Sequence, residues 1–121
     1  MSNHEKINYI ELPTRNIKAV KEFYANVFNW QFTDYGPEYT AFSQAGIDGG
    51  FFVSERSCNT AQGSALVVLY SDSLEQTQAK IEQAGGTIVQ EIFSFPGGRR
   101  FHFSDPTGNE LAVWSDKGLE D

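Results

Sequence analysis

FHFSDPTGNELAVW, residues 101–114, decides the fold, because it predicts two short strands joined by a tight turn. In the turn, residues 105–109, a proline fixes one φ angle and the Gly-Asn pair tolerates positive φ. Such a turn sets the register, so we expect Ser104 opposite Glu110 and His102 opposite Ala112. Alternation then gives an apolar face for a helix to cover and a mixed face typical of a pocket wall. The apolar face holds Phe101, Phe103, Leu111 and Val113; the mixed face holds His102, Ser104, Glu110, Ala112 and Trp114.

The composition limits the classes of partner. The 121 residues suit one domain, and nine basic residues against sixteen acidic ones leave a net charge of −7. A nucleic-acid partner is not expected, because the chain lacks a basic stripe. No stretch reaches the roughly 18 apolar residues of a membrane span, and the polar N-terminus does not resemble a secretory signal. The single cysteine, Cys58, excludes an internal disulfide, so we expect a cytoplasmic protein. Because the chain is acidic, we expect no anionic membrane surface as a partner.

Periodicity and turn residues predict the remaining elements. Asn16 is the expected N-cap of a first helix, and Ser73 with Gln76 forms the expected capping box of a second helix. Strands are predicted at 7–13, 30–35, 39–43, 51–53, 64–70 and 87–91; turns or loops are predicted at 46–50, 54–63 and 93–99.

The two halves of the chain repeat this pattern. A shift of 57 residues pairs Ile10 with Val67 and Asn16 with Ser73, although sequence identity is close to nil. The repeat predicts an α+β fold of two βαβββ modules, about 5–55 and about 64–117, in one domain spanning 1–121. The modules would form a concave mixed sheet with the helices outside. Between them we expect a trough, lined by the faces that the helices do not cover.

Several short segments carry a resemblance to a known family. They are Tyr-Ile-Glu-Leu-Pro at 9–13, Phe-Tyr at 23–24, Val-Phe-Asn-Trp at 27–30, Gly-Gly-Phe-Phe-Val at 49–53 and Asp-Pro-Thr-Gly-Asn at 105–109. In this order they resemble the vicinal oxygen chelate superfamily of glyoxalases, bleomycin resistance proteins and extradiol dioxygenases. The resemblance is greatest to small glyoxalase-like proteins without an assigned reaction. It implies the glyoxalase fold and a homodimer.

The resemblance also implies four positions that hold a divalent ion in metal-dependent members. They fall on Tyr9, Leu66 and Ala112, with the fourth near Gly50–Phe52. None of these residues is a His or carboxylate ligand of the kind that Zn, Ni, Mn or Fe selects. We therefore expect no catalytic metal and no cofactor.

Three polar side chains are candidates for chemistry. His102 could act as a general base or donate a hydrogen bond to a ligand; alternatively, it is a partly buried histidine satisfied by a neighbour. Glu11 faces the trough or pairs with an arginine (Arg15, Arg99 or Arg100). For Glu110 we expect a solvated surface carboxylate, with a ligand contact as the alternative. If His102 meets one of these glutamates, the pair could do acid–base work near neutral pH.

Aromatic residues would form the walls of the trough. Together with Leu66 and Ala112, the expected ligand-binding residues are Tyr9, Phe52, Tyr70, Glu110 and Trp114. Such walls bind flat or apolar molecules. The same residues could instead pack against a second subunit or fill a closed core. The loop 93–99 is either a lid over the trough or an ordinary connection.

Three functions remain open. The first is a metal-independent protein that binds a small aromatic or apolar molecule, similar to the bleomycin resistance branch. The second is a metal-free isomerase or lyase acting on a carbonyl metabolite, with His102 or Glu11 as proton carrier and Tyr9 as donor. The third is an accessory domain with a collapsed cavity. The fold alone does not select among them.

Overall fold

Two copies of one strand–helix–three-strand arrangement follow each other along the chain. The computed structural model describes residues 2–118. Module one comprises β1 (Tyr9–Thr14), α1 (Ile17–Phe28), β2 (Gln31–Asp34), β3 (Tyr39–Ser43) and β4 (Asp48–Val53). Module two comprises β5 (Val67–Tyr70), α2 (Leu74–Gln83), β6 (Thr87–Phe95), β7 (Gly98–Ser104) and β8 (Glu110–Ser115). The linker between them holds one short 3-10 helix, η1 (Thr60–Gln62). The predicted α+β class with two βαβββ modules is confirmed.

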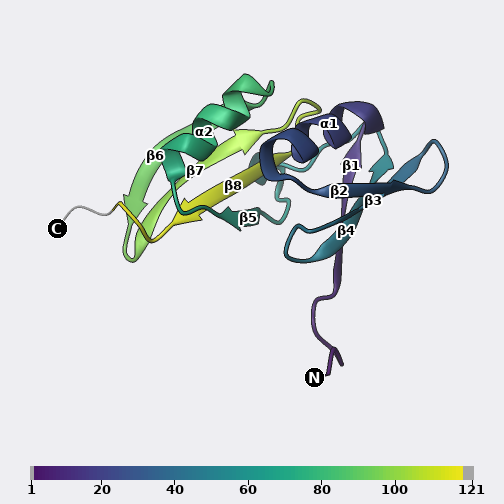
Figure 1. The fold of residues 1–121 in the computed structure, drawn as a ribbon, viewed down its shortest axis with the longest axis horizontal. Coiled ribbons are helices and arrows are strands. Elements are labelled where there is room, and N and C mark those ends of the chain that lie inside the picture. The colour runs from purple at the N-terminus through teal and green to yellow at the C-terminus, as the bar shows by residue number, and fades with distance from the viewer. Residues whose placement is uncertain (1, 119–121) are drawn as a thin grey trace.

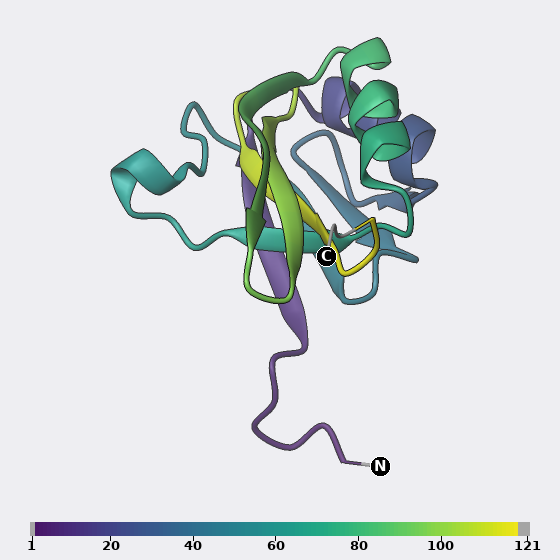
Figure 2. The same ribbon diagram turned by 90° about the vertical axis from the view of Figure 1, so that its left-hand side faces the viewer.

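Each module folds into a mixed four-stranded sheet. The strand orders are β1-β4-β3-β2 and β5-β8-β7-β6, and the first strand of each module runs parallel to its last. Figure 1 shows the sheets side by side with both helices above them, and in Figure 2 the linker projects away from the helices. Each sheet thus has one helix-covered face and one uncovered face. Within residues 2–118, no helix is long and apolar enough to cross a membrane.

Helix α1 begins and ends where the sequence predicts. The Asn16 side chain accepts a hydrogen bond from the backbone N–H of Ala19 at 3.0 Å, as an N-cap residue does. Asn29 ends the helix in the left-handed conformation, with a φ of 63°. The buried residues recur at three- and four-residue spacing, so one stripe of the helix faces the core. They are Val20, Phe23, Tyr24 and Val27.

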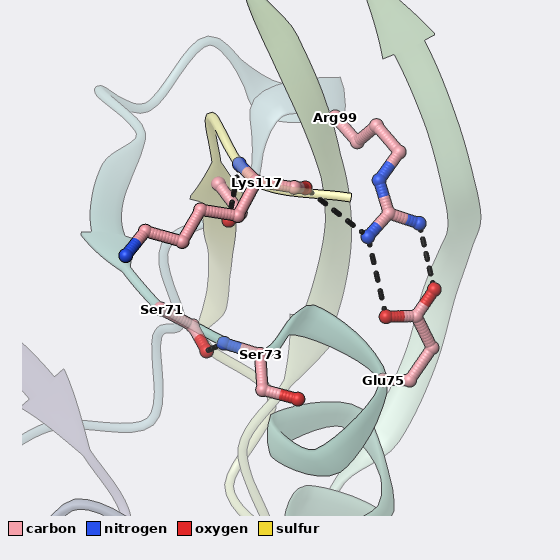
Figure 3. Close-up of polar contacts among 6 residues, drawn as sticks. Ser71, Ser73, Glu75, Arg99 and Lys117 are labelled. Carbon is pink, nitrogen blue, oxygen red and sulfur yellow. Dashed lines mark hydrogen bonds and ion pairs between the residues drawn. The ribbon is translucent and has the colours of Figure 1, made fainter. Parts of the chain in front are cut away.

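Helix α2 begins at the predicted residue but without the predicted capping box. The Ser73 side chain makes no capping hydrogen bond, and its backbone N–H donates to Ser71 Oγ at 3.0 Å (Figure 3). Ser71 Oγ also forms a hydrogen bond with Thr77 Oγ1 at 2.7 Å. The predicted box with Gln76 is wrong because the hydroxyl of Ser71, two positions before Ser73, lies against the first turn.

The β7–β8 hairpin has the predicted register. Ser104 lies opposite Glu110 and His102 lies opposite Ala112. The apolar face packs under the helices, and its four side chains are fully buried: Phe101, Phe103, Leu111 and Val113. Strand alternation therefore directs His102 and Trp114 to the uncovered face of module two.

The glycines assigned to a turn at 46–50 instead lie partly within β4. Gly49 pairs with Phe42 of β3, and Gly50 pairs with Ala41. A Cβ atom on Gly49 would collide with the Phe42 ring, and one on Gly50 would collide with the Tyr39 hydroxyl. Glycine occurs in this strand because aromatic side chains of β3 lie across it.

The predicted loop 93–99 is wrong, because most of it belongs to the β6–β7 hairpin. Phe93 pairs with Arg100, and Phe95 pairs with Gly98. Only Pro96 and Gly97 connect the strands, and Gly97 takes a φ of 101° that suits glycine. Arg100 of β7 also stacks on Phe93 and Phe95 of β6. Residues 93–99 are therefore held within the hairpin and do not form a separate lid.

The turn at 105–109 is organised by the buried carboxylate of Asp105. One oxygen, Oδ1, accepts hydrogen bonds from the backbone N–H of Thr107 at 2.8 Å and of Asn109 at 3.1 Å. It also accepts one from Thr107 Oγ1 at 3.0 Å. The carboxylate therefore holds both arms of the turn.

The same turn binds module one. Tyr24 of α1 donates its hydroxyl to Asp105 Oδ2 at 2.9 Å, and Asn109 donates its amide to the Pro13 carbonyl at 2.7 Å. Thr14 Oγ1 donates to Thr107 Oγ1 at 3.0 Å. Burial, and then the Asp105 charge, raise the pKa of Tyr24 well above its ordinary value, so this phenol remains a donor.

We expect Tyr24→Phe to destabilise the protein by removing the hydroxyl that joins α1 to the turn. A hydrogen bond to a charged group contributes about 1.5–3 kcal/mol, so the free energy of unfolding should fall by that amount in urea denaturation. Tyr35→Phe is the matched control, because Tyr35 is 66% exposed and its change should cost less than about 0.5 kcal/mol. Equal stability of both variants would show that the Tyr24 bond contributes nothing.

Candidate functional site

His102 and Glu110 form a buried pair on the uncovered face of module two. His102 Nδ1 lies 2.7 Å from Glu110 Oε2, and each side chain is only 8% exposed. Glu110 is the first residue of β8 and lies diagonally across from His102 of β7. A contact between His102 and one of the candidate glutamates was predicted as a condition for acid–base chemistry, and Glu110 supplies it.

The linker covers Glu110, so the expectation of a solvated surface carboxylate is wrong. The backbone N–H and the hydroxyl of Thr60 donate to Glu110 Oε1 at 2.8 and 2.9 Å. The backbone N–H of Glu110 donates to the Cys58 carbonyl at 2.7 Å. Burial alone would raise the pKa of Glu110, but the hydrogen bonds from Thr60 and His102 outweigh it and lower that pKa. The carboxylate is therefore ionised at neutral pH.

An ionised Glu110 determines the tautomer of His102. The carboxylate only accepts hydrogen bonds, so Nδ1 of His102 carries the proton that it shares with Glu110. In the neutral imidazole, Nε2 then carries a lone pair. This atom is buried and has no hydrogen-bond partner within residues 2–118. The arrangement of a base held by a carboxylate can accept a proton or a hydrogen bond from a bound molecule.

Glu11 lies on the uncovered face of module one, in a cluster of phenols. Tyr39 donates its hydroxyl to Glu11 Oε2 at 2.9 Å and shares a hydrogen bond with the Tyr9 hydroxyl. The predicted alternative of an ion pair with Arg15 is not found, because that arginine donates to the Glu55 carbonyl. Burial, then these hydrogen bonds, raise the pKa of Tyr39. Tyr39 was missed because the sequence does not show that it lies across Gly50.

Of the other candidate residues, Tyr70 and Trp114 meet on module two, whereas Phe52 lies on module one. Tyr70 and Trp114 contact each other edge to face on module two, with ring centroids 5.2 Å apart. A hydrogen bond to Asp116 is the main cause that raises the pKa of Tyr70 to about 12. Ala112 is fully buried in β8, and Leu66, just before β5, is half-buried. Phe52 is 39% exposed on module one.

A cavity of about 530 Å³ opens between the modules. Its wall is mainly apolar and includes Ile10, Phe28, Trp30, Phe42, Ala45, Val67, Leu69 and Tyr70. Most of these residues belong to the helix-facing sides of the sheets, so the predicted lining by uncovered faces is wrong. Glu11 and Phe52 line a separate cavity of about 440 Å³ beside the linker. The difference arises because the sequence does not show which faces of the modules meet.

The donor set does not fit the divalent ion that metal-dependent relatives would hold. Tyr9, Ala112 and Gly50 occupy β1, β8 and β4 without a ligand of that type. Nowhere in the described part of the chain do three or more His, Cys, Asp or Glu side chains gather closely enough to hold a metal ion. We therefore derive no chemistry through a metal.

We expect Glu110→Gln to destabilise the protein at pH 7 by about 1–3 kcal/mol, because glutamine keeps the shape but loses the charge that His102 and Thr60 need. Because folding lowers the pKa of Glu110, its ionised carboxylate stabilises the fold at any pH above the ordinary pKa of a glutamate. This stabilisation is lost as the pH falls through the lowered pKa. The difference in unfolding free energy between the variant and the wild type should therefore shrink as the pH falls from 7 to below the ordinary pKa of a glutamate. Urea denaturation across this range measures it.

Glu82→Gln is the control, because Glu82 lies exposed on α2. It should change stability by less than about 0.5 kcal/mol at any pH in the range. A constant difference between Glu110→Gln and wild type from neutral to acidic pH would contradict an ionised Glu110.

Comparison with known proteins places this geometry in a family. A sequence model of the Glyoxalase/Bleomycin resistance protein/Dioxygenase superfamily matches residues 6–113. No curated protein matches the sequence significantly.

Solved structures share the fold at low sequence identity. A glyoxalase/bleomycin resistance protein/dioxygenase family enzyme from Burkholderia phytofirmans PsJN has a TM-score of 0.75 at 16% identity, over 89% of this chain and 96% of that one. TioX from Micromonospora sp. ML1 has a TM-score of 0.70 at 16% identity, over 90% of this chain and 97% of that one. Lactoylglutathione lyase from Agrobacterium tumefaciens has a TM-score of 0.69 at 18% identity, over 98% of this chain and 100% of that one. The family match, with the shared fold, shows that this chain belongs to the glyoxalase, bleomycin resistance protein and dioxygenase superfamily.

Proposed function

We propose that the protein binds a small aromatic or apolar molecule, independently of a metal ion, in the cavity between its modules. The apolar wall of this cavity is the observation that carries the proposal. Its volume of about 530 Å³ lies within the roughly 300–1,000 Å³ of typical small-molecule sites. Burial of apolar ligand surface would supply the affinity.

The wall is rigid on the side of module one. Trp30 stacks on Tyr24 with ring centroids 4.6 Å apart and on Phe42 at 4.7 Å. Because Trp30 is held between these two rings, the part of the wall that Trp30 and Phe42 form is already ordered before a ligand arrives, which lowers the entropic cost of binding. The module two side, with Val68 and Tyr70, is more exposed and forms the entrance.

We expect Ala45→Phe to abolish binding of naphthalene, because the added ring fills the cavity that Ala45 lines. The measurement is quenching of Trp30 fluorescence in a Trp114→Phe background, which leaves Trp30 as the single tryptophan. Naphthalene should also raise the melting temperature of the parent and not of Ala45→Phe.

Ala79→Phe, on the exposed surface of α2, is the matched control and should bind like the parent. Equal quenching in both phenylalanine variants would place the ligand elsewhere. No ligand-induced stabilisation by any apolar probe would favour an accessory domain instead.

A second candidate function is a metal-free isomerase or lyase acting on a carbonyl metabolite. The contact between His102 and Glu110, at 2.7 Å, favours it. His102 Nε2 would take a proton from the carbon beside a carbonyl group, while Glu110 stabilises the imidazolium that forms. Glu11, the other predicted proton carrier, lies on module one in contact with Tyr39, whose hydroxyl also bonds to that of Tyr9, the predicted donor. The binding function ranks first because no cavity described above is lined by His102.

A further inference from the structure

We infer that the uncovered face of module two carries a second binding site, for a small planar anion that also bears a hydroxyl group. Arg100 would bind the anionic oxygen, and His102 Nε2 would accept a hydrogen bond from the hydroxyl. The site is separate from the intermodule cavity, so it goes beyond the proposed binding function. It also names a class of ligand for the His102–Glu110 pair.

Alternation along β7 places the two residues together. Arg99, Phe101 and Phe103 point to the helix side, where Arg99 forms a two-point ion pair with Glu75 of α2 at 2.6 and 3.2 Å (Figure 3). Arg100 and His102 therefore point to the uncovered face, on Cα atoms about 6.6 Å apart. Glu110 of β8 and Thr60 of the linker complete the polar surroundings of His102.

Both residues hold an unpaired buried atom. Neither Nε of Arg100 nor Nε2 of His102 has a hydrogen-bond partner within residues 2–118. The first is an N–H donor on a cation; the second is an acceptor in the neutral imidazole, because Glu110 holds the proton on the other ring nitrogen. Unpaired buried polar atoms are costly and uncommon in native proteins. A ligand with an anionic oxygen and a hydroxyl satisfies both atoms at once.

Aromatic rings surround the pair and favour a flat ligand. The guanidinium carbon of Arg100 lies 5.3 Å from the ring centroid of Phe93 and 5.9 Å from that of Phe95. The Phe93 and His102 rings lie 6.1 Å apart. Trp114 lies directly opposite Arg100 on β8. These faces can stack on an aromatic ring.

The cover over His102 is the least regular part of the sheet. The β6–β7 ladder shifts register between Ile88 and Gln90, and again between Gln90 and Phe93. Between these shifts, Gln90 pairs with His102 itself. Bulges interrupt the ladder and are common beside functional sites. The shift between Gln90 and Phe93 interrupts the ladder beside His102, where a ligand would have to reach the buried Nε2.

The probe is 3-hydroxybenzoate. The two comparison compounds are benzoate, which lacks the hydroxyl group, and phenol, which lacks the carboxylate. Calorimetric titration of the full chain should show 3-hydroxybenzoate binding at least tenfold tighter than either. Arg100→Met keeps the apolar stem of the side chain but loses the cation, and His102→Gln loses the imidazole. Each substitution should lower the affinity for 3-hydroxybenzoate at least tenfold. Arg99→Met, one residue away on the other face, should leave its affinity unchanged.

A second readout follows the imidazole nitrogens by NMR. The chain has two histidines, and the other, His4, lies exposed near the N-terminus, so it is an internal reference. 3-Hydroxybenzoate should shift the Nε2 resonance of His102 and leave both His4 nitrogens unmoved. This measurement needs no variant, so it decides the matter even if His102→Gln fails to fold.

Three results would overturn the inference. They are equal affinity for 3-hydroxybenzoate and benzoate, no binding at millimolar concentration, and full affinity in Arg100→Met. If Ala45→Phe abolishes 3-hydroxybenzoate binding while Arg100→Met leaves it unchanged, the ligand occupies the intermodule cavity. The proposed binding function would then stand and this site would fail. If Arg100→Met alone abolishes binding, this site stands whatever becomes of the cavity.

Discussion

The Asp105 carboxylate is the interaction on which the rest of the structure depends. Its two oxygens order the turn between β7 and β8 and also receive the Tyr24 hydroxyl from module one. One buried charge thus sets the register of the hairpin and the position of α1. Because every neighbour donates to it, the charge is satisfied without a basic partner. Together with the hydrogen bonds from Asn109 to Pro13 and from Thr14 to Thr107, this carboxylate joins the turn to module one.

The modules share a fold but carry different chemistry on their uncovered faces. In module one, Glu11 is held by the phenol of Tyr39, and no histidine among residues 2–118 bonds to it. In module two, Glu110 holds His102 and leaves one ring nitrogen unpaired within the described residues. The linker causes part of this asymmetry, because Thr60 adds two hydrogen bonds to Glu110. The repeat therefore explains the architecture, whereas the linker explains where a proton acceptor can lie.

Much of the fold could be predicted because its signals are local. The turn chemistry at 105–109 and the Asn16 cap act within a few residues, and both are found as predicted. The burial of Glu110 could not be predicted, because it depends on polar linker residues without periodicity. The strand character of Gly49 and Gly50 depends on aromatic rings from β3. The cavity wall depends on how two modules pack, which is a property of neither module alone.

The joint between the modules also has a consequence for how the chain folds. The hydrogen bonds from the turn region to Tyr24, Thr14 and Pro13 span 81, 93 and 96 residues of sequence. Closing loops of this length is entropically costly, and such distant contacts slow folding. During synthesis, module one emerges from the ribosome long before the carboxylate that orients its helix. Module one therefore lacks these hydrogen bonds until residues 105–109 have been made.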